Sequence, residues 1–157
     1  MSGSQVDVLL VAVDGSKGSQ QAVSLAGDLA QRMGVSIQLL YAFPNSAAEL
    51  FGPPGEGMPH EQFKYLNPDN FQVLRDESAR KVFDEARALL EPSLQENVQE
   101  VLLSGQPREA IIAYAKEREN PMILVGRRGL SSIGEMFLGS ISQYLVHHAH
   151  CPVTVVN

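Results

Sequence analysis

The chain has 157 residues, of which 44% are hydrophobic and 19% charged, so we expect a single globular domain over residues 1–157. Its formal net charge of −6 argues against nucleic acid and membrane partners, since both need a basic surface. One cysteine excludes an internal disulfide, and with no signal-peptide pattern at the N-terminus we expect a cytoplasmic protein.

The first half of the chain predicts two strands around a helix. Val6–Val13 and Val35–Phe43 are apolar runs of the kind found in parallel sheets that are covered on both faces. Between them, apolar residues recur at helical spacing as far as Met33, and Gly34 supplies a helix stop. The segment Pro44–Asn70 contains five prolines and three glycines without a sustained period, which predicts a long loop with room for one short helical turn.

The second half predicts three more helices and three more strands in alternation. They are a helix from Phe71 to near Pro92, a strand over Asn97–Gly105, a helix from Pro107, a strand over Met122–Gly126, a helix from Gly139 and a strand over residues 152–157. This alternation predicts an α/β fold. We expect a doubly wound, Rossmann-like sheet of five parallel strands in the order 3-2-1-4-5, with helices on both faces.

The stretch "GRRGLSSIGEMFLGS", residues 126–140, places glycines at 126, 129 and 139, and the last is followed by Ser140. If the first strand lies beside the fourth, the winding reverses between Asp14 and Gly126, where open parallel sheets bind ligands. Glycines there favour close approach of the backbone to phosphates, and a helix that starts at Ser140 offers free amides to an anion. The alternative is a glycine-rich connector that ends in a serine helix cap.

The Gly-x2-Gly-x9-Gly-Ser spacing after the fourth strand, with Asp14 after the first, resembles the ATP-binding branch of the universal stress protein family. The likeness runs from "VAVDGS" through "SGQPREAI" and "MILVGRRG" to "CPVTVV", and only Pro44–Asn70 lies outside it. In that family the loop holds the ribose and triphosphate of ATP. The resemblance therefore implies that the ligand is ATP with a divalent metal, Mg²⁺ or Mn²⁺.

The resemblance also implies a role for each matching residue. It assigns Val13, Asp14, Ala42, Val125 and Gly126 to the nucleoside, Gly105 to the ribose, and Gly129, Gly139, Ser140 and Ile141 to the phosphates. Relatives usually carry a small polar residue where this chain has Arg127. Arg127 and Arg128 either add positive charge near the phosphates or point to solvent; we favour solvent for Arg127 and keep Arg128 as a candidate ligand.

The expected function is that of an ATP-binding regulatory or sensor protein. The alternative is a slow ATPase or another enzyme that acts on adenine nucleotides, but "VDGSKGS" lacks the "SGGxDS" pattern of ATP pyrophosphatases, and Glu135 is the only carboxylate between Gly126 and Ser140. We therefore assign no catalytic residue. A structural stress protein without a nucleotide is disfavoured by the glycine spacing. His147–Cys151 places its ligands consecutively at a helix end, where they diverge, so we expect no metal site there.

Two expectations concern surfaces. The apolar strand over residues 152–157 should be an edge, and in the resembling family these strands pair antiparallel, so we expect a homodimer or a higher oligomer and an unidentified protein partner.

Pro44–Asn70 follows the second strand beside the expected adenine. Either it packs over the site or onto a neighbouring subunit and reports nucleotide occupancy, or it is a mobile insertion without a role.

Overall fold

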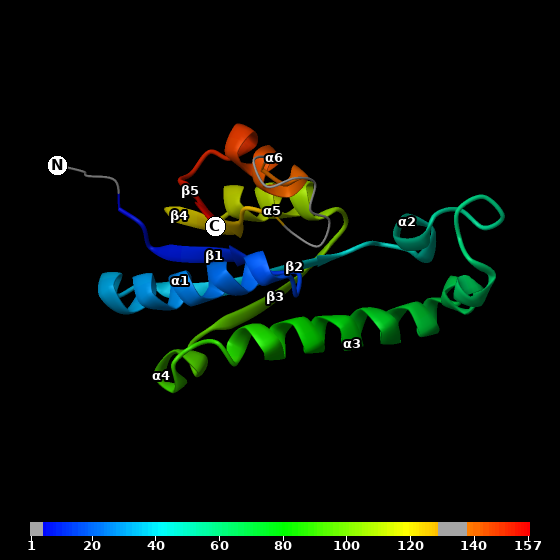
Figure 1. Ribbon diagram of the computed structural model, residues 1–157, viewed down its shortest axis with the longest axis horizontal. Helices are drawn as coiled ribbons and strands as arrows, with labels where there is room; N and C mark the ends of the chain where they lie inside the picture. The colour runs from blue at the N-terminus through cyan, green and yellow to red at the C-terminus, as the bar shows by residue number, and fades with distance from the viewer. Residues whose placement is uncertain (1–4, 129–137) are drawn as a thin grey trace.

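The computed structural model describes residues 5–128 and 138–157. Its five strands form one parallel sheet in the order β3-β2-β1-β4-β5 (Figure 1), which confirms the predicted topology. The strands are β1 (Val8–Ala12), β2 (Ser36–Phe43), β3 (Gln99–Ser104), β4 (Pro121–Gly126) and β5 (Val153–Val156). β3 and β5 are therefore the edges, and the winding reverses between β1 and β4.

The helices cover both faces of the sheet. They are α1 (Lys17–Met33), α2 (Ala47–Phe51), the 3₁₀-helix η1 (His60–Leu66), α3 (Pro68–Arg87), α4 (Pro92–Gln95), α5 (Pro107–Lys116) and α6 (Ser140–His148). Figure 1 shows α1 and α3 on one face and α5 and α6 on the other. None of these helices, within the described ranges, is long and apolar enough to span a bilayer.

Two hydrophobic clusters form because successive side chains of each strand point to opposite faces. Leu9 and Val11 of β1 pack with the alanines of α1 and with Phe83 of α3. Leu10, on the other face, packs with Leu145 of α6. These three β1 side chains are fully buried, as are Ile123 and Leu124 of β4, which explains why both strands are continuous apolar runs in the sequence.

The segment between β2 and α3 is more ordered than the sequence predicts. It contains α2 and η1, and α3 begins at Pro68 rather than Phe71. A third cluster ties the segment to the sheet, with Phe43, Met58 and Phe71 buried together. Figure 1 shows α2 and the start of α3 extending beyond the carboxyl ends of the strands, so this part of the chain stands beside the region where a ligand is expected.

Candidate functional site

A cavity of about 300 Å³ opens at the carboxyl ends of β1, β2 and β4, where the winding reverses. Its lining residues are Ala12, Val13, Asp14, Ser16, Ser19, Leu40, Tyr41, Ala42, Phe43, Pro44, Leu50, Pro107, Ile111, Val125, Gly126, Arg128, Gly139, Ser140, Ile141 and Ser142. The volume lies at the lower end of the range for small-ligand sites, roughly 300–1,000 Å³. The fold therefore supplies a ligand-sized cavity at its expected position.

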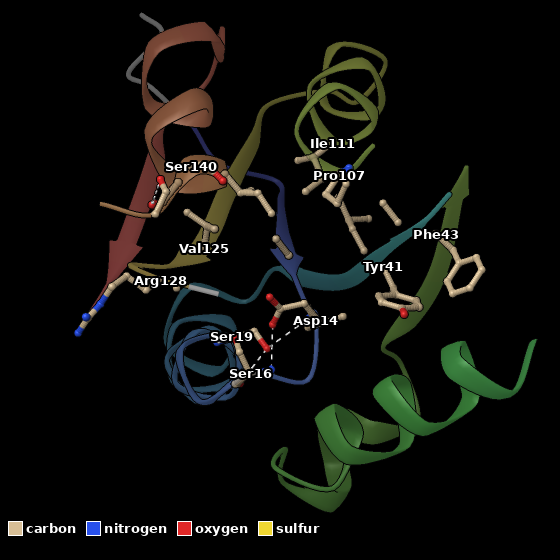
Figure 2. A pocket seen from close by; sticks show the side chains of 18 of the residues that line it. Asp14, Ser16, Ser19, Tyr41, Phe43, Pro107, Ile111, Val125, Arg128 and Ser140 are labelled. Atoms are coloured by element: carbon tan, nitrogen blue, oxygen red, sulfur yellow. Dashed lines mark hydrogen bonds between the residues drawn. The ribbon is translucent and has the colours of Figure 1, made fainter. Parts of the chain in front are cut away.

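The turn from β1 into α1 fixes one polar side of this cavity. Gly15 adopts a positive φ of 82°, and the Asp14 carboxylate accepts a 2.9 Å hydrogen bond from the backbone N–H of Ser16. Ser16 caps α1, because its hydroxyl oxygen accepts a 3.2 Å bond from the N–H of Ser19. The Ser19 hydroxyl in turn accepts from the N–H of Asp14 and donates to the carbonyl of Ser16. These bonds hold the carboxylate of Asp14 at the cavity in one orientation (Figure 2).

The neck of the glycine loop forms the second polar side. The N–H of Gly139 donates to the carbonyl of Arg127 at 2.7 Å, and the buried Ser142 hydroxyl lies 2.8 Å from the same carbonyl and 3.1 Å from that of Gly139. The N–H of Arg127 donates to Val156 of β5 at 2.7 Å. The two ends of the loop are thus fastened to each other and to the sheet, which points the N-terminus of α6 at the cavity.

The helix cap at this neck is Gly139, and Ser140 is the first helical residue. The amides of the first turn of α6 have no partner within the helix, and they carry the positive end of its dipole. This turn is therefore suited to an anion. Figure 2 shows Ser140 beside Val125, while the guanidinium of Arg128 extends away from Asp14 and the centre of the cavity.

The opposite side of the cavity is mainly apolar. Leu40, Ala42, Phe43, Pro44, Leu50, Pro107 and Ile111 line it. Figure 2 places Tyr41 and Phe43 across the cavity from Ser140. Burial, and after it the negative charge of Asp14, raise the pKa of the Tyr41 phenol, so this side chain stays neutral. The cavity therefore has one apolar end and one end rich in hydroxyls and amides.

The structure shows a packing requirement at Gly126 that the sequence does not predict. A Cβ at this position would lie 2.5 Å from the backbone carbonyl carbon of Gly18, in the first turn of α1, and 2.7 Å from its oxygen. A Cβ on Gly18 would lie 2.4 Å from the carbonyl oxygen of Arg128. Gly126 lines the cavity, and the packing of α1 on β4 by itself requires that this position lack a side chain.

The structure brings together nine of the predicted site residues. Val13, Asp14, Ala42, Val125, Gly126, Arg128, Gly139, Ser140 and Ile141 all line the cavity. Gly105 does not; it turns the chain after β3 with a φ of 107°, and its N–H donates to Phe43 at 2.9 Å. Gly129 lies outside the described residues. Tyr41 and Leu50 line the cavity without having been predicted, because their positions depend on the register of β2 and on α2.

Comparison with known proteins identifies the family. A model of the universal stress protein family matches residues 6–157. The "Universal stress protein in QAH/OAS sulfhydrylase 3′ region" of Thermus aquaticus is 34% identical over 148 residues, which cover 94% of this chain and 96% of the relative. The chain belongs to the universal stress protein family.

Solved structures of that family share the fold at low sequence identity. A universal stress protein crystallised in complex with cAMP has a TM-score of 0.62 at 22% identity, and the match covers 96% of this chain and 97% of that one. A universal stress protein from Archaeoglobus fulgidus in complex with dAMP has a TM-score of 0.54 at 17% identity, over 99% of this chain and all of that one (100%). At this identity the likeness establishes the Rossmann-like fold.

Proposed function

We propose that the cavity between β1 and β4 binds ATP, and that the protein acts as a nucleotide-dependent regulator. The observation that carries the proposal is the division of the cavity into an apolar end and a polar end at the start of α6. An adenine ring suits the first, and phosphates suit helix amides and serine hydroxyls. Two relatives with the same fold bind adenine nucleotides, cAMP and dAMP, which supports the same ligand class for this chain.

A divalent metal fits the oxygen donors of the polar end. Mg²⁺ and Mn²⁺ prefer carboxylate, hydroxyl and phosphate oxygens. Asp14, Ser19 and Ser140 offer such atoms at the cavity. Mg²⁺ commonly binds to a protein together with substrate phosphates, and only one or two carboxylates of the protein coordinate it. We therefore propose that the metal arrives with ATP and that Asp14, in addition to the place beside the nucleoside expected from the sequence, contributes the protein's negative charge to it.

Binding rather than turnover is the function that the described residues favour. Hydrolysis needs a group that orients the attacking water. Asp14 is the only carboxylate among the described lining residues, and one of its oxygens already accepts from the N–H of Ser16. We therefore assign this protein a regulatory role that responds to ATP occupancy, and we propose no catalytic residue.

Nucleotide occupancy is expected to reach the rest of the molecule through the segment between β2 and α3. Pro44 and Leu50 of this segment line the cavity, and Leu50 belongs to the short helix α2. A bound adenine at the apolar end would contact both. Hydrogen exchange over residues 44–66 should slow when ATP is added. Equally fast exchange with and without ATP would mean that the segment only joins β2 to α3 and does not respond to the nucleotide.

We also propose that the protein is a homodimer formed through β5. β5 is an edge of the sheet, so one side of its backbone offers unpaired hydrogen-bonding groups. Its four residues, Val-Thr-Val-Val, favour strand pairing. An antiparallel contact with the β5 of a second copy would satisfy these groups. Dimerisation would place two nucleotide cavities in one assembly, so that nucleotide binding could change the quaternary structure.

The direct test of ATP binding is an NMR titration of the ¹⁵N-labelled protein with ATP and Mg²⁺. Saturable changes in the backbone amide chemical shifts are expected at Asp14, Ala42 and Ser140, which together sample the different sides of the cavity. Gly139→Val places a branched side chain at the start of α6 and should weaken binding by about tenfold or more, while Gly139→Ser keeps a small and favourable helix cap and should bind like the wild type. Equal affinities for the two variants would contradict the phosphate assignment.

A further inference from the structure

A second cavity, of about 330 Å³, lies between α2, the end of η1, the first half of α3 and the end of β3. The lining residues on which the argument depends are Asn45, Tyr65, Phe71, Gln72, Arg75 and Ser104. Pro44 alone also lines the first cavity. The helix α2 separates the two, with Ala47 and Ala48 at the second cavity and Leu50 at the first.

The charged residue of this second cavity is Arg75. Its side chain is half-buried on α3, and no carboxylate of the described chain lies within ion-pair distance of it. Other arginines differ: Arg87 is 2.8 Å from Glu100, and Arg118 is 3.8 Å from Glu117. A guanidinium that is partly withdrawn from water, without a counter-ion among the described residues, favours an anion, which it can bind through two parallel N–H groups.

Neutral polar groups and aromatic rings complete the lining. The side chains of Asn45, Gln72 and Ser104 form no hydrogen bond with any described residue, so their donors and acceptors are available to a ligand. Phe71 is buried in the wall, and the ring of Tyr65 stacks on that of Phe51 with 5.6 Å between centroids. The cavity therefore combines one cation, several hydrogen-bonding groups and an apolar wall, which is the usual composition of a small-molecule site.

We propose that this second cavity binds a small organic anion. Arg75 pairs with the carboxylate or phosphate group of the ligand, Gln72 and Asn45 donate to it, and the rings of Tyr65 and Phe71 contact its apolar body. The proposal does not depend on the nucleotide assignment, since Arg75 and the two rings lie outside the first cavity. A carboxylic acid and a phosphate monoester share the required chemistry, and the experiment separates them.

The experiment is an NMR titration of the full chain with benzoate, with phenyl phosphate and, as a neutral control, with benzyl alcohol. Saturable shifts are expected for the side-chain amides of Asn45 and Gln72 with at least one of the two anions, and the tighter anion identifies the headgroup. Arg75→Gln should weaken that binding by about tenfold or more, because a hydrogen-bonded charge is lost. Arg80→Gln, an exposed arginine on the same helix, is the matched control and should leave the affinity unchanged.

Any of the following results would overturn the proposal. The shifts could fail to saturate with either anion, benzyl alcohol could bind as tightly as the anions, or Arg75→Gln could bind the anion as tightly as Arg80→Gln does. Arg75→Lys keeps the charge but loses the paired N–H groups and should fall between the wild type and Arg75→Gln. Shifts confined to Ser140 and Asp14 would mean that the anions enter the first cavity only, which would contradict this proposal and leave the nucleotide proposal intact.

Discussion

Replacing Gly126 with alanine is expected to destabilise the fold even without a nucleotide. The added Cβ would lie 2.5 Å from the carbonyl carbon of Gly18, 2.7 Å from its oxygen and 2.9 Å from its Cα. The shortest of these contacts is roughly 1 Å inside the separation at which carbon atoms attract best. All three atoms belong to backbone in the first turn of α1, so no side chain can rotate away and α1 has to move from β4.

The expected cost follows from this geometry. Overpacking of an interior costs about 1–3 kcal/mol, and we expect about 3 kcal/mol because both neighbours are rigid. In a chain of this length such a loss lowers the melting temperature by roughly 6–12 °C. Thermal and urea unfolding of the nucleotide-free protein, followed by circular dichroism, would measure it.

Gly27→Ala provides the matched control. Its Cβ would meet the tip of the Leu90 side chain at 3.1 Å, and that side chain can adjust. Alanine also favours the interior of α1 over glycine by about 1 kcal/mol, so this variant should be about as stable as the wild type. If Gly126→Ala matched Gly27→Ala in stability and lost only nucleotide affinity, the packing explanation would be wrong and the glycine would serve the approach of the ligand.

Three further predictions concern the site and the sheet edge. Because the pKa of Tyr41 is raised, its contribution to stability is complete below pH 10 and is lost as the pH rises through the raised value; Asp14→Asn should lower that pKa, and a phenolate titration that shows no change would contradict the coupling. Ser142→Ala removes the buried hydroxyl that bonds to Arg127 and should cost about 0.5–1.5 kcal/mol of unfolding free energy in urea, because the Arg127 carbonyl keeps its bond from the N–H of Gly139; an unchanged unfolding free energy would contradict this. Val155→Asp should convert a dimer into a folded monomer by light scattering, and a wild type that is already monomeric at micromolar concentration would remove the dimer proposal.

The sheet could be predicted because its strands are buried on both faces. Val8–Ala12 and Pro121–Gly126 are buried at nearly every position, so they appear in the sequence as continuous apolar runs. Their alternation with helices then leaves few topologies.

The segment between β2 and α3 was predicted as a loop because prolines and glycines interrupt any period. Local signals for α2 and for the start of α3 were nevertheless present. Ser46 and Glu49 have the spacing of a capping box, and the Ser46 hydroxyl accepts from the N–H of Glu49 at 3.2 Å. Asn67 before Pro68 is a helix start, with the Asn67 side chain accepting from the N–H of Asp69 at 2.9 Å. For these helix starts, the capping residues are therefore a better guide than the content of proline and glycine.

Long-range contacts account for what the sequence could not predict at the site. Asp14, Gly139 and Ser140 follow from strand order and helix starts, and they line the cavity. The requirement for Gly126 comes from Gly18, which is far away in the chain and adjacent only after folding. Leu50 reaches the cavity through the packing of α2, which no local pattern specifies.

A crystal structure of the protein grown with ATP and Mg²⁺ in excess tests the central claim most directly. The account predicts the adenine at the apolar end beside Ala42, and the phosphates at the first turn of α6 beside Gly139 and Ser140. Nucleotide bound elsewhere on the molecule, or an empty cavity between β1 and β4 under these conditions, would contradict it.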